Sequence, residues 1–99
     1  MARVNMHGAR VKASIITAGL LLWRRDPASV TARQIGKQMN MTHSAILYHF
    51  GSAEALKDAI AAHAVAVGDM IIVPQLITAR HPAAAAISPA DRVRYLSGC

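Results

Sequence analysis

The stretch from Thr31 to Phe50, TARQIGKQMNMTHSAILYHF, decides the fold of this chain. Its apolar residues recur at helical spacing, the pattern stops at Asn40, and it then resumes. Thr31 and Thr42 each stand where a helix N-cap is expected. Asn tolerates the left-handed conformation that a sharp turn between helices requires. The sequence therefore predicts one helix from Thr31 through Met39 and another from Thr42 to Phe50.

These two predicted helices carry the residues needed for a close crossing. Gly36 places a small residue midway along the first helix. Five apolar residues are expected to point inward and hold the angle: Ile35, Met39, Met41, Ile46 and Phe50. The residues left outside on the second helix are Thr42, His43, Ser44, Ala45, Leu47, Tyr48 and His49. A short face that is polar at its N-terminal end is typical of a helix that meets base edges, so the pattern predicts a helix-turn-helix. The alternative is a basic amphipathic hairpin.

The flanking sequence completes an all-α fold. Residues 1–10 are expected to form a flexible basic arm. A helix is predicted from Val11 to Arg25, ended by Asp26-Pro27, because a residue before proline avoids the helical region. Its buried stripe is expected to hold Ile15, Ile16, Gly19, Leu22 and Trp23.

A fourth helix is predicted from Ser52, ended or kinked at Pro74. Its apolar stripe is expected to hold Leu56, Ile60, Val67, Met70 and Ile71. Beyond it we expect a short helical piece or loop, and then a terminal helix with Ser88 as N-cap. The alanine run before Ile87 fits either a helix or a packed turn. The predicted organisation is an arm over 1–10, a DNA-binding domain over 11–73 and a helical tail over 74–99.

Composition and charge agree with a small helical protein that binds a polyanion. The chain has 99 residues, enough for one small domain, and is 54% apolar with few aromatic residues. No β-branched alternation repeats along it, and Ala and Leu favour helices. The net charge of +6 attracts nucleic acid, although a basic balance can also serve solubility alone.

Cysteine usage and hydropathy favour a soluble cytoplasmic protein without a membrane segment. Cys99 is the only cysteine, so no internal disulfide forms, which fits a reducing compartment. The apolar stretch from Ala13 to Trp23 is too short to cross a bilayer, and no cleavage pattern follows it.

Residues from about Ile15 to Ile60 resemble the DNA-binding domain of tetracycline-repressor-like (TetR) transcriptional regulators. IITAGLLLW is similar to that family's first helix, TARQIGKQMNMTHSAILYHF to its helix-turn-helix, and GSAEALKDAI to the start of its fourth helix. The most specific piece is ILYHFGSAEAL. The resemblance implies a transcriptional regulator, and we expect it to act as a repressor. The Ala/Val-rich end of the fourth helix and the tail after Pro74 are the candidate surface for a homodimer, whose two-fold symmetry implies a palindromic operator.

This chain departs from the family pattern in three places, and the first two remove phosphate contacts that contribute to affinity for DNA. Family members usually have Tyr where this chain has Leu47, and often Lys where it has Ala53; both contact the DNA backbone. The loop after Asp26 is one residue short. Arg3, Arg10 and Lys12 are expected to compensate. The family's effector-binding domain is not matched by the short tail, so we expect no small-molecule effector of the usual type, as suits a phage or prophage regulator.

Individual roles follow from side-chain chemistry. Arg33 is suited to bidentate contact with guanine, and Thr31 caps a helix whose free amides attract a phosphate. Ala45 offers only apolar contact, for example to a thymine methyl group, while His43 can donate to a base or a phosphate. Each of these residues also has an ordinary structural role open to it, as a cap or a solvated side chain.

Leu47, Tyr48 and His49 complete the expected interface. Tyr48 and His49 are expected to contact phosphates, with packing as the alternative for either. Leu47 is expected to be exposed, where it either contacts DNA or marks a surface that binds protein.

Other chemistry has little support in the sequence. The five histidines lack the spacing with a carboxylate or cysteine that would suggest zinc. With few acids and no glycine-rich phosphate loop, we expect neither an enzyme nor a cofactor. The prediction is a DNA-binding regulator. The alternative is an interaction module that pairs with or inhibits another DNA-binding protein, through Leu47 and the apolar Leu20 and Leu21.

Overall fold

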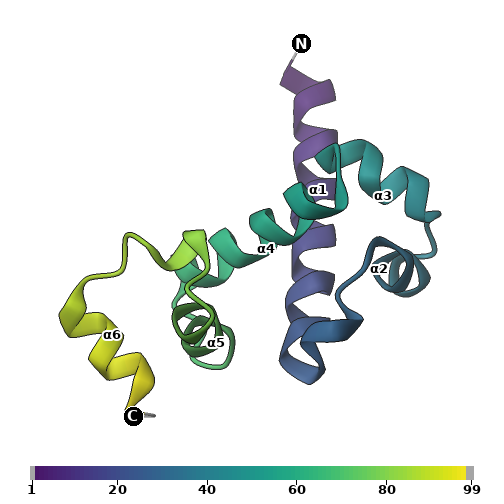
Figure 1. Ribbon diagram of the computed structural model, residues 1–99. Helices are drawn as coiled ribbons and strands as arrows, with labels where there is room; N and C mark the ends of the chain where they lie inside the picture. Colours follow the sequence, from purple (N-terminus) through teal and green to yellow (C-terminus); the bar gives the residue numbers. More distant parts are fainter. Residues whose placement is uncertain (1, 98–99) are drawn as a thin grey trace. The chain divides into compact units, whose positions relative to one another are not determined.

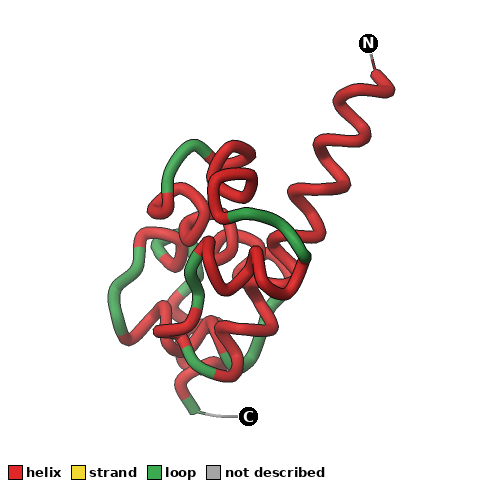
Figure 2. Tube along the Cα trace, turned by 90° about the vertical axis from the view of Figure 1, so that its right-hand side faces the viewer, coloured by secondary structure: helices red, strands yellow, loops and turns green. Residues whose placement is uncertain are grey.

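The computed structural model describes residues 2–97, and it describes the side chains of residues 8–97. Six helices follow one another, and the described residues contain no strand (Figures 1 and 2). They are α1 (Ala2–Arg25), α2 (Ala32–Met39), α3 (His43–Phe50), α4 (Ala53–Val67), α5 (Ile72–Thr78) and α6 (Pro89–Leu96). Two short 3₁₀ turns, η1 (Pro27–Ser29) and η2 (Pro82–Ala84), join helices. The predicted all-α fold class is confirmed.

Contacts divide the chain into two compact units, which are described separately. The N-terminal unit is Met1–Ile60 and the C-terminal unit is Ala61–Cys99. The division falls within α4, earlier than the boundary between residues 73 and 74 that the sequence suggested.

The N-terminal unit is built around one apolar core. Four isoleucines from four helices are fully buried there: Ile15, Ile35, Ile46 and Ile60. The other buried members are Ala18, Leu22, Val30, Ala32 and Leu56. Each large side chain removed from water contributes about 1.5–3 kcal/mol, so this core is the main force that holds the helices together.

Glycine at position 19 lets α1 approach this core. A Cβ atom there would overlap the Cδ1 atom of Ile60, and it would lie 3.5 Å from Cδ1 of Ile35. The backbone of α1 is therefore in direct contact with the side chain of Ile60. Because Ile60 is fully buried, that contact is part of the core.

The caps predicted around the central stretch are confirmed. Thr31 Oγ1 accepts a hydrogen bond from the Gln34 amide at 3.1 Å, and Thr42 Oγ1 accepts one from the Ala45 amide at 3.1 Å. The α2 helix ends at Asn40, which has a left-handed φ of 57°. Gly51, with φ of 90°, ends α3. Since side-chain caps and left-handed residues set helix ends locally, the sequence specified these bounds well.

The start of α1 differs from the sequence expectation. The helix begins at Ala2, so residues 2–10 are helical, whereas an arm was predicted for 1–10; Met1 lies outside the described residues. Gly8 is the strongest helix breaker in this segment, and a single glycine costs only about 1 kcal/mol relative to alanine. An established helix gains one hydrogen bond for each residue added, so it can extend through such a position.

The end of α4 also differs from the prediction. The helix ends at Val67, and the chain turns at Gly68, whose φ is 69°. Pro74 lies inside the first turn of α5, where a missing amide hydrogen costs nothing because no partner exists for it. The prediction that Pro74 ends or kinks one long helix was wrong.

The early turn at Gly68 changes which apolar side chains are buried. Leu56 and Ile60 are buried as predicted. Val67, Met70 and Ile71 were expected to continue the buried stripe, but they are 57%, 49% and 52% exposed. A stripe extrapolated at helical spacing fails once the helix itself has ended.

The C-terminal unit packs α5 against η2 and α6. Ile72, Val73, Leu76 and Ile77 of α5 are buried, and Ala84 of η2 is 2% exposed. Part of the alanine run is thus a packed 3₁₀ turn, which settles the choice that the sequence left open. The Arg92 side chain fastens this turn, since Nε donates to the Ile87 carbonyl at 3.0 Å and Nη2 to that of Ala84 at 2.8 Å.

The terminal helix begins as predicted. Ser88 Oγ accepts the Asp91 amide at 3.2 Å, and Pro89 occupies the first helical position. The run PQLITARHP, which the sequence assigned to a short helical piece or a loop, contains most of α5.

No single helix within the described residues is long and apolar enough to cross a membrane. Helices α4 and α5 meet the length and composition criteria only as a pair, and that pair is bent by 115° at its break.

Candidate nucleic-acid interface

The α3 helix has one face in the core and the opposite face in solvent. Ile46 is completely buried. Ser44 and Tyr48 stand two residues before and after it, which places both on the far side of the helix. Ser44 is exposed, and the Tyr48 side chain is 85% exposed. A large aromatic residue therefore projects from a helix that is held by its buried side.

The first turn of α3 adds further exposed groups. Thr42 and His43 are both exposed at the N-terminal end, and Ala45 is half-buried at the edge of the exposed face. His49 is also half-buried, and its ring meets that of Tyr48 edge to face with centroids 5.7 Å apart. This contact supports the base of the projecting tyrosine.

Leu47 differs from its sequence expectation. It was expected to be exposed, but it is half-buried and packs against the core of the N-terminal unit. Position 47 lies only about 100° around the helix from Ile46, so its side chain reaches the margin of the apolar face. Much of the Leu47 side chain therefore packs against the core.

The turn between α2 and α3 is fixed by backbone contacts around Gly36. The Gly36 carbonyl accepts hydrogen bonds from the amides of both Asn40 and Met41, the latter at 2.8 Å. A Cβ atom at position 36 would overlap the Met41 carbonyl oxygen. Glycine was predicted here for the crossing of the helices. The closest contact of this position is instead with the backbone at Met41, where the chain passes back over α2 after the turn.

The five residues predicted to point inward do so to different degrees. Ile35 and Ile46 are fully buried. Met39, Met41 and Phe50 are half-buried and pack against the same core. The Lys12 Nζ atom lies 5.9 Å from the centre of the Phe50 ring, so α1 brings a cation to this end of α3.

Cations also line the neighbouring surface of α2. Arg33 and Lys37 are exposed and stand one helical turn apart. Together with Asn40, Thr42 and His43 they line a shallow hollow beside the turn. Figure 1 shows α2 and α3 side by side next to α1. The structure thus brings Arg33 and His43 to one surface. It adds Lys37, which the sequence analysis did not assign to the site, to the same hollow.

Thr31, the remaining predicted site residue, is exposed at the start of α2. Lys57 is a further exposed cation that the sequence analysis missed. It lies one turn after Ala53 on α4, and Ala53 is the position where the lysine of the family pattern is absent. The sequence could have indicated this, because residues 53 and 57 are four apart and so lie on the same face of a helix.

Charge is concentrated in the N-terminal unit. Residues 1–60 hold eight Lys or Arg and three Asp or Glu, which gives +5 of the total +6. Residues 61–99 hold three Lys or Arg and two Asp or Glu, which gives +1. The unit that contains α2 and α3 therefore carries nearly all of the attraction for polyanions.

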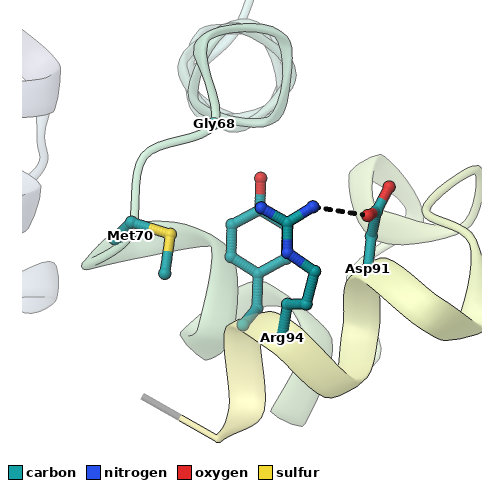
Figure 3. Close-up of a pocket in the computed structure, with 5 residues that line it drawn as sticks. Gly68, Met70, Asp91 and Arg94 are labelled. Atoms are coloured by element: carbon teal, nitrogen blue, oxygen red, sulfur yellow. Dashed lines mark hydrogen bonds and ion pairs between the residues drawn. The ribbon is translucent and has the colours of Figure 1, made fainter. Parts of the chain in front are cut away.

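The C-terminal unit has its own cavity of about 310 Å³, lined by Gly68, Met70, Asp91, Arg94 and Tyr95 (Figure 3). Arg94 Nη1 donates to Asp91 Oδ1 at 3.3 Å, and both side chains are more than half exposed. The charged groups of this cavity are therefore paired with each other. It contributes no residue to the surface of α2 and α3.

Within the described residues, no group of three or more His, Cys, Asp or Glu side chains is placed to hold a metal ion. Comparisons with models of protein families, with curated proteins and with solved structures found no match for this chain. The resemblance to TetR-like regulators stays a prediction from the sequence.

Proposed function

We propose that this chain is a sequence-specific DNA-binding transcriptional regulator. It acts as a repressor by occupying a palindromic operator as a homodimer, with α3 as the recognition helix of a helix-turn-helix. The observation that carries the proposal is the pairing of α2 and α3 across a fixed turn, with the exposed side of α3 free of core contacts.

The exposed side of α3 supports this role. An α-helix with its side chains is about 10–12 Å across, and the major groove of B-DNA, about 12 Å wide, admits one. Ile46 anchors the buried side, so the exposed side can enter a groove without losing packing. The first turn then presents His43, Ser44 and Ala45 to base edges, while Tyr48 reaches a phosphate or sugar.

The positive charge supports a phosphate-binding surface around that helix. Arg33 and Lys37 stand on the neighbouring helix, Lys57 on the first turns of α4, and Arg10 and Lys12 on α1. Lys57 and Lys12 supply cations that replace the missing family contacts at Leu47 and Ala53. Contacts of this kind position a protein on DNA without selecting its sequence.

The C-terminal unit supplies the surface for assembly. It carries little net charge, and five of its large apolar side chains are at least 49% exposed: Val67, Met70, Ile71, Val93 and Leu96. Exposed apolar groups on a nearly neutral unit favour association with another protein surface. A homodimer would present two recognition helices to two half-sites related by two-fold symmetry.

A second candidate function is an interaction module that pairs with or inhibits another DNA-binding protein. The observation that favours it is the exposure of Val93 and Leu96, at 67% and 55%, three residues apart on one face of α6. Leu21 on α1 is also 51% exposed. In this alternative the apolar surface contacts a different chain.

A selection from random duplexes, with sequencing of the bound pool at fixed near-physiological salt, tests the proposal. Salt is fixed because phosphate contacts alone produce salt-dependent affinity for any sequence. Enrichment of a palindrome is the expected result. A pool without any enriched sequence would contradict the proposal, and copurification of a second repressor-like chain would favour the interaction module.

A further inference from the structure

Building on the proposed function, we propose that α3 recognises thymine through its methyl group. The part of the half-site that faces α3 is then composed of A·T pairs, with a thymine methyl against the Ala45 side chain. Guanine enters the half-site only at its edge, opposite Arg33 on α2.

The side chains of α3 exclude the usual two-bond recognition of purines. Arg and Lys make paired contacts with guanine, and Asn and Gln make them with adenine. The sequence of α3, HSAILYHF, contains none of these four residues. It also lacks Asp and Glu, which accept from the cytosine amino group. Recognition by this helix therefore depends on single hydrogen bonds and apolar contacts.

The single hydrogen bonds available to α3 discriminate poorly. Ser44 pairs with any base edge, since a hydroxyl both donates and accepts. His43 can donate to purine N7, but N7 is an acceptor in both adenine and guanine. Tyr48 reaches a phosphate or sugar and so selects no base. These contacts tolerate several bases, so discrimination between bases depends on DNA shape and on contacts with methyl groups.

Ala45 and Thr42 present methyl groups at the N-terminal end of the exposed face. The Ala45 amide is already bound by Thr42 Oγ1 at 3.1 Å, so only the Ala45 methyl group remains for DNA. Ala45 is half-buried at the edge of that face, which gives the methyl a fixed position. Alanine and threonine methyls are suited to contact with the thymine C5 methyl, and no other base carries that group.

Of the two exposed cations that line the hollow on the adjoining helix, Arg33 and Lys37, Arg33 has the planar fork that suits guanine best. It stands in the first turn of α2, beside the hollow that also contains His43. The expected half-site therefore combines a thymine-containing centre with one guanine beside it.

The test replaces each thymine of the selected duplex by deoxyuridine, which lacks only the C5 methyl. Burial of one methyl group is worth about fourfold in affinity, so one deoxyuridine position per half-site should weaken binding by about that factor. Ala45→Ser should reduce affinity for the thymine duplex and abolish the deoxyuridine effect at that same position. Ala66→Ser, at an exposed position of α4, is the matched control and should retain the effect.

Each outcome decides between the inference and the function on which it rests. A palindrome with a methyl-sensitive thymine that depends on Ala45 supports both. A specific site that shows no deoxyuridine effect, or has G·C pairs opposite α3, overturns thymine recognition and leaves the proposed function standing. The absence of any selected site overturns both.

Discussion

At the scale of single residues, Tyr48 and Gly36 show how α3 is presented. Tyr48 is 85% exposed, although a tyrosine of a folded domain usually buries much of its ring. Its exposure follows from the full burial of Ile46, which fixes the opposite side of the helix. Gly36 fixes the position of α3 relative to α2, because its backbone contacts the start of the turn.

Substitution of Gly36 by alanine should destabilise the N-terminal unit by about 1–3 kcal/mol, the usual cost of forcing an extra carbon into a packed site. The added Cβ would overlap the Met41 carbonyl oxygen, which the backbone of the turn holds in place. Urea unfolding measures this change when it is followed by the fluorescence of Trp23, the chain's single tryptophan, because Trp23 lies in the N-terminal unit.

The matched control is Gly8→Ala on α1, where a Cβ atom would meet nothing within 4 Å. Alanine should stabilise that helical position by about 0.5–1 kcal/mol. Equal stability of Gly36→Ala and the unsubstituted protein would show that the turn is not closed as described.

At the scale of elements, Asp69 governs the start of α5. Asp69 is 4% exposed, and its Oδ1 atom accepts hydrogen bonds from the amides of Ile71 and Ile72, each at 2.9 Å. These bonds satisfy two amides that have no partner inside the helix. Gly68 makes the preceding turn, so the pair Gly68-Asp69 separates α4 from α5.

Asp69→Ala should destabilise the C-terminal unit by about 1–2 kcal/mol, as expected for the loss of a helix cap. The hydrogen exchange rates of the Ile71 and Ile72 amides should rise, since both lose their acceptor. Asp69→Asn retains an oxygen acceptor and should lose less. If exchange at these two amides were unchanged in Asp69→Ala, the carboxylate would not be their acceptor.

The contrast between α2–α3 and α4–α5 explains what the sequence could predict. The bounds of α2 and α3 were predicted correctly because Thr31, Asn40 and Thr42 determine them through local hydrogen bonds and a left-handed turn. The break after α4 was misplaced because Pro74 was given more weight than Gly68. Proline ends a helix only beyond its first turn, and which turn Pro74 occupies depends on where the preceding break falls.

The exposure of the predicted site residues could be tested, and the sequence predicted it correctly for some residues and not for others. The outward placement of Ser44 and Tyr48 follows from spacing relative to Ile46 alone. The partial burial of Leu47 depends on packing against the core, which spacing does not specify. Lys37 was missed because the hollow that it shares with Arg33 and His43 forms only in the folded chain, whereas Lys57 could have been found from its spacing to Ala53.

At the scale of the whole molecule, charge and apolar surface are divided between the two units. Residues 1–60 carry +5, whereas residues 61–99 carry +1 and several exposed apolar side chains. Under the proposed function, the first unit provides the attraction for DNA and the second provides the surface for association between copies.

The salt dependence of DNA binding should report on individual phosphate contacts. Lys37→Gln and Lys57→Gln should each lower the slope of log affinity against log salt by about 0.9, because each phosphate contact releases about one counterion. Arg94→Gln, in the C-terminal unit, is the control and should leave the slope unchanged. A slope unaffected by both lysine substitutions would remove α2 and α4 from the interface.

Association between copies should depend on the exposed face of α6. The chain is expected to be a dimer at micromolar concentration, and Val93→Ser combined with Leu96→Ser should shift it towards monomer. Both side chains are more than half exposed, so the substitutions should cost the folded unit little. Sedimentation equilibrium measures the change. A chain that is monomeric without substitution, and selects a site without two-fold symmetry, would defeat the dimer model.

The central claim is that the exposed face of α3 contacts DNA, and an amide NMR titration of the ¹⁵N-labelled chain with a short duplex tests it most directly. At fixed salt, the largest shifts are expected at His43, Ser44 and Tyr48, with smaller ones at Thr31 and Arg33, while the amides of α5 and α6 stay in place. Shifts confined to residues 61–97, or no shifts at all, would contradict it.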